Sequence, residues 1–146
     1  MKTIKGIVAG KLITPKEEIN NIIIEFDEKI IADIRPFSGE IPKDFLDAKN
    51  MIVTPGFIDI HIHGAEGFDA TRDDYYGIKN MSKILPKYGI TGFMPTAICS
   101  PKDRFRRFIQ IVYELWKTEN EGARVLGAHL EGPFINPKKK GAQPIE

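Results

Sequence analysis

One segment of the sequence reads Pro55-Gly56-Phe57-Ile58-Asp59-Ile60-His61-Ile62-His63-Gly64. Its Pro-Gly turn leads into an alternation of apolar and polar residues, which predicts a β-strand. Residues two apart on a strand point to the same side and lie about 7 Å apart, so the imidazoles of His61 and His63 are expected side by side. The isoleucines then face the opposite side, where we expect a covering layer of helices. Because neutral imidazole is the commonest metal ligand in proteins, the pair indicates a divalent metal site.

The composition is that of an ordinary globular domain of 146 residues, 42% of them hydrophobic. A net charge of +1 offers no electrostatic attraction for nucleic acid or an anionic membrane. The sole cysteine, Cys99, cannot form an internal disulfide, which favours a reducing compartment. We find neither the apolar core of a signal peptide nor an apolar run of about 20 residues. We therefore expect a cytoplasmic protein with no nucleic-acid or membrane partner.

The first part of the chain, residues 1–50, is predicted to be rich in strands. Three apolar, β-branched runs cover 7–13, 21–26 and 30–34, and the last two are joined by a short polar turn. This arrangement is typical of a β-hairpin. We expect a small antiparallel sheet here, forming one half of a β-sandwich.

The second part, residues 51–146, alternates between strand and helix patterns. Strands are predicted over 51–62, 90–97 and 124–130, with helices over 73–88 and 101–118 between them. A βαβαβ order predicts a parallel sheet with right-handed crossovers, and hence an α/β fold. The second helix is expected to face inward with Phe105, Phe108, Ile109, Val112 and Leu115, and Trp116 is also expected in the core.

Polar side chains gather where these strands end. His129 and Glu131 are two positions apart, so they share one face of the third strand, and Gly132-Pro133 turns the chain just beyond them. Active sites of parallel α/β folds form at the carboxyl ends of strands. Glu131 together with His61 and His63 is a plausible set of ligands for a divalent ion, with an open position for water.

Neighbouring polar residues each allow two interpretations. His129 is expected to orient Glu131 or to pair with backbone. Asp59 could orient an imidazole or bond nearby backbone, and neither alternative is favoured. Thr96 is expected to be a packing or loop hydroxyl. The basic run over 138–140 is expected to be a solvated loop, with weak attraction for a phosphorylated ligand as the alternative.

The segment 55–64 resembles the first-strand motif of the amidohydrolase superfamily. Two further segments resemble the N-acetylglucosamine-6-phosphate deacetylase family more selectively: Gly127-Ala128-His129-Leu130-Glu131-Gly132-Pro133-Phe134-Ile135-Asn136-Pro137 and Gly89-Ile90-Thr91-Gly92-Phe93-Met94-Pro95-Thr96. The resemblance covers the whole chain, as the N-terminal portion of such an enzyme. It implies the first three strands of a (β/α)₈ TIM-type barrel, preceded by part of a small antiparallel β-sandwich. Since a complete barrel typically needs about 250 residues, we expect an incomplete chain.

The resemblance also implies a reaction, the removal of acetate from N-acetylglucosamine 6-phosphate to give glucosamine 6-phosphate. Glu131 matches the family's metal ligand, and His61 and His63 match a pair that supports a second metal in some members. Ala142 and Gln143 match a loop that contacts the sugar. Zinc is the leading metal, with iron, cobalt or manganese as alternatives, and one or two ions are expected. The general-base Asp and two further metal-binding His are expected beyond residue 146, so the fragment alone is expected to be inactive; the full-length enzyme is expected to be a homodimer.

Two other functions compete with this one. The first is another amidohydrolase, either a dihydroorotase-like cyclic amidase or a deaminase. Such enzymes usually carry a carboxylated Lys on a fourth strand, and the run over 130–134 argues against them. The second is a truncated fragment with structural content only and no catalytic role.

Overall fold

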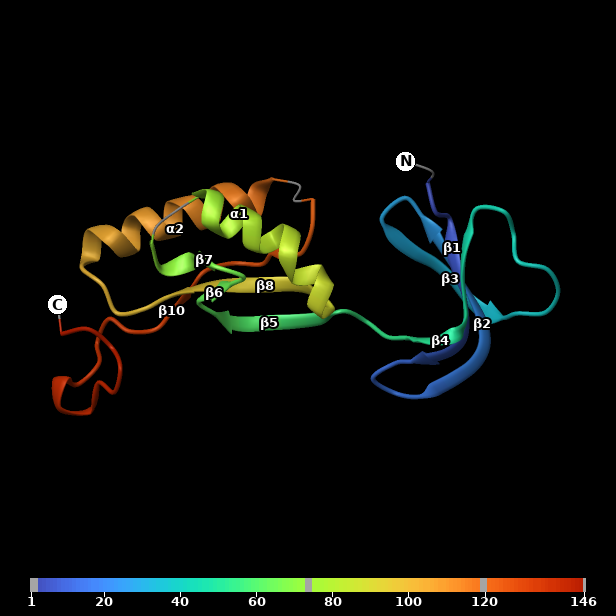
Figure 1. The fold of residues 1–146 in the computed structure, drawn as a ribbon, viewed down its shortest axis with the longest axis horizontal. Helices are drawn as coiled ribbons and strands as arrows, with labels where there is room; N and C mark the ends of the chain where they lie inside the picture. Colours follow the sequence, from blue (N-terminus) through green and yellow to red (C-terminus); the bar gives the residue numbers. More distant parts are fainter. Residues whose placement is uncertain (1–2, 73–74, 119–120, 146) are drawn as a thin grey trace. The chain divides into compact units, whose positions relative to one another are not determined.

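The computed structural model describes residues 3–72, 75–118 and 121–145. It is a mixed α/β protein whose chain divides into two compact units, Met1–Pro55 and Gly56–Glu146 (Figure 1). Among the described residues, none of the helices is both long enough and apolar enough to cross a membrane.

The first unit is a four-stranded sheet in the order β3-β2-β1-β4. β1 pairs antiparallel with β2, and β2 pairs antiparallel with β3, whereas β4 pairs parallel with β1. The sheet is therefore mixed, and the expectation of a purely antiparallel sheet was wrong for its fourth strand. Its core is formed by aliphatic side chains of the two central strands, which are buried because neighbours flank them on both sides. The strands are β1 (Gly6–Ile13), β2 (Glu18–Asp27), β3 (Ile30–Pro36) and β4 (Phe45–Val53).

The strand predicted over 51–62 is two strands in the structure. β4 ends at Val53, and β5 (Phe57–Ile62) begins after Pro55. Proline has no backbone N–H to give to a ladder, so it separates strands readily. Residues 45–50 were not expected to be strand, but they pair with β1 from its first residue onward. That pairing joins segments far apart in the sequence, so no local sequence pattern predicts it.

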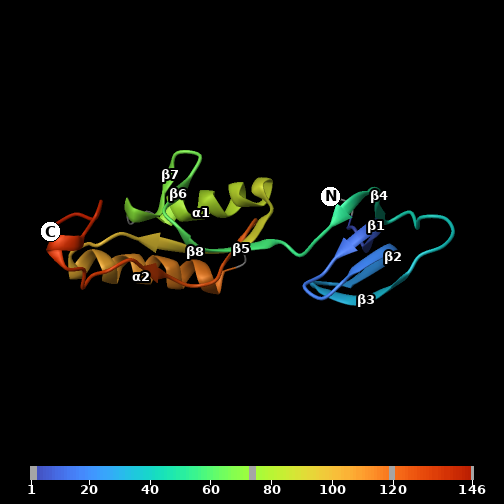
Figure 2. The same ribbon diagram turned by 90° about the horizontal axis from the view of Figure 1, so that it is seen from below.

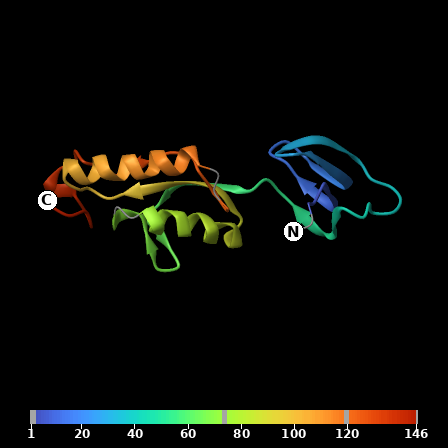
Figure 3. The same ribbon diagram turned by 90° about the horizontal axis from the view of Figure 1, so that it is seen from above.

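The second unit contains a parallel sheet in the order β10-β8-β5, with β9 also paired to β8. The predicted alternation of strands and helices is confirmed, but the strand predicted over 124–130 is two short strands, β9 (Arg124–Val125) and β10 (His129–Leu130). Both long helices lie on one face of this sheet (Figures 1, 2 and 3). Residues 73 and 74 of the first predicted helix lie outside the described residues, and its last turn is a 3₁₀-helix. The elements after β5 are the hairpin β6 (Gly64–Ala65) and β7 (Phe68–Asp69), η1 (Ala70–Arg72), α1 (Tyr75–Ile84), η2 (Leu85–Tyr88), β8 (Ile90–Ala97), α2 (Lys102–Lys117), β9 (Arg124–Val125), β10 (His129–Leu130) and η3 (Pro137–Lys139).

The core of this unit lies between the helices and the sheet. Side chains at helical spacing on α1 and α2 pack against β8 and β9, because residues three and four apart share one face of a helix. The fully or almost fully buried members include Ile78, Met81, Leu85, Phe93, Phe105, Phe108, Val112, Leu115 and Val125.

Four apolar residues that were expected to be covered are largely exposed. Ile109 and Trp116 on α2 are 43% and 48% exposed, and Ile58 and Ile60 on β5 are each 62% exposed. The two α2 residues lie beside the buried stripe of the helix, outside its contact with the sheet. β5 is an edge strand, and in the described part of the chain the helices cover its neighbour β8 instead.

Candidate metal centre

His61, His63 and Glu131 come together at the carboxyl ends of β5 and β10. One carboxylate oxygen of Glu131, Oε2, lies 3.1 Å from Nε2 of His63 and 3.4 Å from Nε2 of His61. The two Nε2 atoms are 3.2 Å apart. The three ligand atoms all lie within 4.8 Å of one another, so residues separated by 70 positions in the chain face one point.

His63 is held in place by Thr96 on the neighbouring strand. Its Nδ1 lies 3.1 Å from the Thr96 carbonyl oxygen, which can only accept a hydrogen bond. The hydrogen therefore resides on Nδ1, and the lone pair of Nε2 is directed toward Glu131 and His61. A ligand histidine with its other nitrogen bonded to a carbonyl is a common arrangement in metal sites.

His129 and Asp59 both bond the backbone of β5. His129 Nδ1 lies 2.6 Å from the Ile60 carbonyl oxygen, so of the two roles expected for this residue the structure shows backbone pairing. Asp59 Oδ1 accepts the backbone N–H of His61 at 3.0 Å, which decides between its two interpretations as well. The His129 ring also contacts the His61 ring, with centroids 4.5 Å apart.

Glu131 is placed by the sheet. Its backbone N–H donates to the Ala97 carbonyl at 2.9 Å, one residue beyond the β8–β10 pairing, so its side chain emerges at the strand end. The three side chains are 34–45% exposed, which leaves the cluster accessible from solvent. Two imidazole nitrogens and one carboxylate oxygen are donors that Zn²⁺ and related divalent ions accept, and three protein ligands leave a position for water. The donor set therefore fits a divalent ion.

No family model matches the chain, but comparison with curated proteins and solved structures finds relatives. The sequence is 36% identical over 140 residues to N-acetylglucosamine-6-phosphate deacetylase of Danio rerio. It is 35% identical over 147 residues to the deacetylase of the same name in Bacillus subtilis (strain 168). Each match covers 92% of this chain.

The chain resembles the N-terminal part of the N-acetylglucosamine-6-phosphate deacetylases. The resemblance predicted from the motifs is thus confirmed. The chain spans about a third of the length of these relatives, 30% and 35% respectively. A crystal structure of N-acetylglucosamine-6-phosphate deacetylase from Pasteurella multocida superposes on 96% of the chain with a TM-score of 0.87, at 25% identity.

The loop expected to contact the sugar in a deacetylase is tied to the sheet through Gln143. Its side-chain Oε1 accepts the backbone N–H of Cys99 at 2.8 Å, and its own carbonyl accepts Lys140 Nζ at 2.8 Å. Cys99 follows β8, so these bonds hold the loop beside a strand end. Ala142 is exposed on the same loop. Motif reasoning gave no sign that Gln143 would anchor the loop, because its partner lies 44 residues away.

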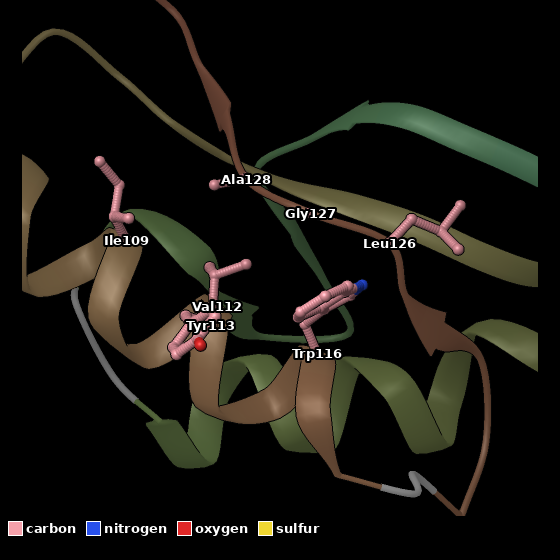
Figure 4. A pocket seen from close by; sticks show the side chains of 7 residues that line it. All are labelled: Ile109, Val112, Tyr113, Trp116, Leu126, Gly127 and Ala128. Atoms are coloured by element: carbon pink, nitrogen blue, oxygen red, sulfur yellow. The ribbon is translucent and has the colours of Figure 1, made fainter.

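A hollow in the second unit is lined by none of the three residues of the candidate metal centre. It has a volume of about 180 Å³ between α2 and residues 126–128, which connect β9 to β10 (Figure 4). Its lining holds neither a carboxylate nor an imidazole, so it lacks the groups for hydrolytic chemistry. The lining residues are Ile109, Val112, Tyr113, Trp116, Leu126, Gly127 and Ala128.

Proposed function

We propose that this chain is the N-terminal portion of a metal-dependent hydrolase that removes acetate from N-acetylglucosamine 6-phosphate. The convergence of His61, His63 and Glu131 carries the proposal, because it combines the ligand types of a hydrolytic metal site at the strand ends of a parallel sheet. The names of the relatives support the substrate.

The chain's own residues would hold the ion. Glu131 supplies the negative charge, while His63, fixed by Thr96, and His61 supply neutral nitrogen donors. A bound divalent ion would polarise the amide carbonyl and lower the pKa of its water. Zinc is proposed first, with iron, cobalt or manganese as alternatives and one or two ions in the site.

The phosphorylated amino sugar would lie against the loop of Ala142 and Gln143. By the family resemblance, we propose that the general-base Asp and two more metal-binding histidines belong to sequence beyond residue 146. We therefore propose that the 146-residue chain does not turn over substrate by itself, and that the longer enzyme works as a cytoplasmic homodimer.

We further propose that residues 51–146 form the first three strands of a (β/α)₈ barrel and residues 1–50 one part of a β-sandwich. The parallel strands with both helices on one face support the barrel. So do the exposed Ile58 and Ile60 and the apolar hollow beside Trp116, since a complete barrel covers such surfaces with further helices.

A cyclic amidase or deaminase remains the alternative hydrolase, and the names of the relatives favour the deacetylase. The decisive test is an assay of the longer protein that contains this chain. N-Acetylglucosamine 6-phosphate should yield acetate and a free amine in equal amounts, and E131Q should lower kcat/KM at least about 100-fold. Dihydroorotate should remain unchanged under the same conditions. Hydrolysis of dihydroorotate, or no release of acetate, would contradict the proposal.

A further inference from the structure

The β5–β8 ladder is irregular where the two histidines lie. The pairing shifts register between Asp59 and Ile62, so regular backbone pairing is interrupted across His61. Side chains bond this stretch instead. Thr96 Oγ1 accepts the Ile62 N–H at 3.0 Å, and His129 Nδ1 donates to the Ile60 carbonyl at 2.6 Å.

We infer that Thr96 and His129 are positioning residues that shape the end of β5 so that His61 and His63 face Glu131 together. This inference rests on the proposed metal centre. From the sequence, Thr96 was expected to be a packing or loop hydroxyl, and His129 to orient Glu131 or pair with backbone; the inference instead has both residues orient the two histidines.

Thr96 contacts β5 through both its side chain and its backbone. The residue is fully buried, and its hydroxyl donates to the Met94 carbonyl at 3.2 Å while it accepts from Ile62. The hydroxyl's single hydrogen is thus used, and its direction is fixed. The Thr96 carbonyl accepts from His63 Nδ1. One residue therefore fixes both the backbone between the two histidines and the ring of the second.

His129 acts on the other side of His61. Its hydrogen bond fixes the carbonyl of Ile60, the residue immediately before His61. Its ring meets the His61 ring edge-on, with an interplanar angle of 63° and centroids 4.5 Å apart. The bonds to Ile60 and Ile62 thus flank His61, and the ring contact restricts the rotation of its side chain. Groups that orient metal ligands in this way typically change metal affinity 10- to 100-fold when they are removed.

The first experiment reads the hydrogen positions directly and needs no metal. Long-range ¹H–¹⁵N NMR spectra of the metal-free 146-residue chain at pH 8 should show His63 and His129 with their hydrogens on Nδ1, because carbonyls are the partners there. Hydrogens on Nε2 of these two residues would overturn the inference.

The second experiment measures Co²⁺ binding and its visible absorption spectrum. T96V keeps the shape and removes the hydroxyl, and H129F keeps a ring and removes the donor. Each should weaken Co²⁺ binding by about 10-fold or more and shift the absorption bands. T96S retains the hydroxyl and should restore the wild-type affinity within about threefold. H129N retains an N–H donor but loses the ring that contacts His61, so it should recover only part of the affinity.

Circular dichroism shows which variants are folded. Equal affinities and spectra for wild type, T96V and H129F would overturn the inference. A wild-type chain that binds no Co²⁺ would contradict the proposed metal centre itself. In that case the hydrogen positions on His63 and His129, read by NMR, would decide whether Thr96 and His129 hold the histidines. If T96V or H129F does not fold, the same hydrogen positions decide the matter in the wild-type chain.

Discussion

Glu131 approaches both imidazoles through the same carboxylate oxygen, at 3.1 and 3.4 Å. Two neutral imidazole nitrogens and one carboxylate oxygen at these distances form a donor set that fits one divalent ion. At this scale the proposed metal centre depends on the charge of one residue, Glu131.

Replacing Glu131 by Gln should therefore weaken Zn²⁺ binding by the 146-residue chain more than about 10-fold, because even residues that only orient ligands cost 10- to 100-fold. Isothermal titration calorimetry provides the measurement. E66Q is the matched control, since Glu66 is an exposed carboxylate at the tip of the β6–β7 hairpin. Equal affinities of E131Q and wild type would show that this carboxylate is not a ligand.

Glu66 itself predicts a dependence of stability on pH. The Tyr88 hydroxyl, which donates at 2.8 Å, and the Lys87 ammonium hold the pKa of Glu66 below its ordinary value of 4.5. A carboxyl whose pKa is lower in the folded state stabilises the fold above its ordinary pKa. It loses that contribution as the pH falls through the lower, folded-state value.

The difference in unfolding free energy between wild type and E66Q should thus be constant at pH 6–7 and shrink as the pH falls below the ordinary pKa of 4.5. Urea titrations at each pH measure it. Y88F removes the main donor and should reduce the pH dependence in the wild-type background. A difference that grows on acidification would contradict the lowered pKa of Glu66.

The same contact raises the pKa of Tyr88. The contribution of the Tyr88 hydroxyl to stability should therefore be lost only at strongly alkaline pH.

At the scale of elements, two neighbouring apolar residues of α2 differ in burial. Phe108 is fully buried in the core, whereas the adjacent Ile109 is 43% exposed beside the hollow. Both residues are apolar and both were predicted to face inward. The difference arises because a helix turns by about 100° per residue, and the sheet covers only one stripe of it.

F108A should lower the free energy of unfolding by about 3–5 kcal/mol, since it leaves a cavity in a packed core. I109A, the matched control on the same helix, should cost about 1 kcal/mol because less apolar surface returns to water. Urea unfolding followed by circular dichroism measures both values. Similar losses for the two variants would mean that the hollow beside Ile109 is closed in solution.

At the scale of the whole molecule, large apolar side chains are exposed both on an edge strand and on a helix. The exposed residues include Ile58 and Ile60 on β5, together with Tyr113 and Trp116 on α2. Exposed apolar side chains promote association, and open sheet edges add to the effect.

We expect the 146-residue chain to self-associate as its concentration rises, and W116K to reduce that association. Sedimentation velocity over a hundredfold concentration range measures it. Y76K provides the control, because Tyr76 is also an exposed aromatic residue but lies on α1, away from the hollow. A wild-type chain that stays monomeric over the whole concentration range would show that these exposed side chains do not drive self-association.

The order and type of most elements could be predicted from periodicity alone. The alternation over 57–62 and the helical spacing of the α1 and α2 core residues are local patterns. Such patterns predict strand and helix without knowledge of the tertiary contacts. β4 could not be predicted in this way, because its first residues become a strand only through pairing with β1. The exposure of Trp116 was also missed, since burial depends on which neighbours are present and not on residue type.

By itself the sequence determined which residue types stand at the strand ends: two histidines with the spacing of one strand face, and a carboxylate before a Gly-Pro turn. Only the tertiary structure decided how they are held. The shifted register at His61, the bonds from Thr96 and His129, and the attachment of Gln143 to Cys99 all join residues 33 to 69 positions apart. Contacts at such separations arise from the packing of the whole sheet, so they cannot be predicted from a local pattern of residues.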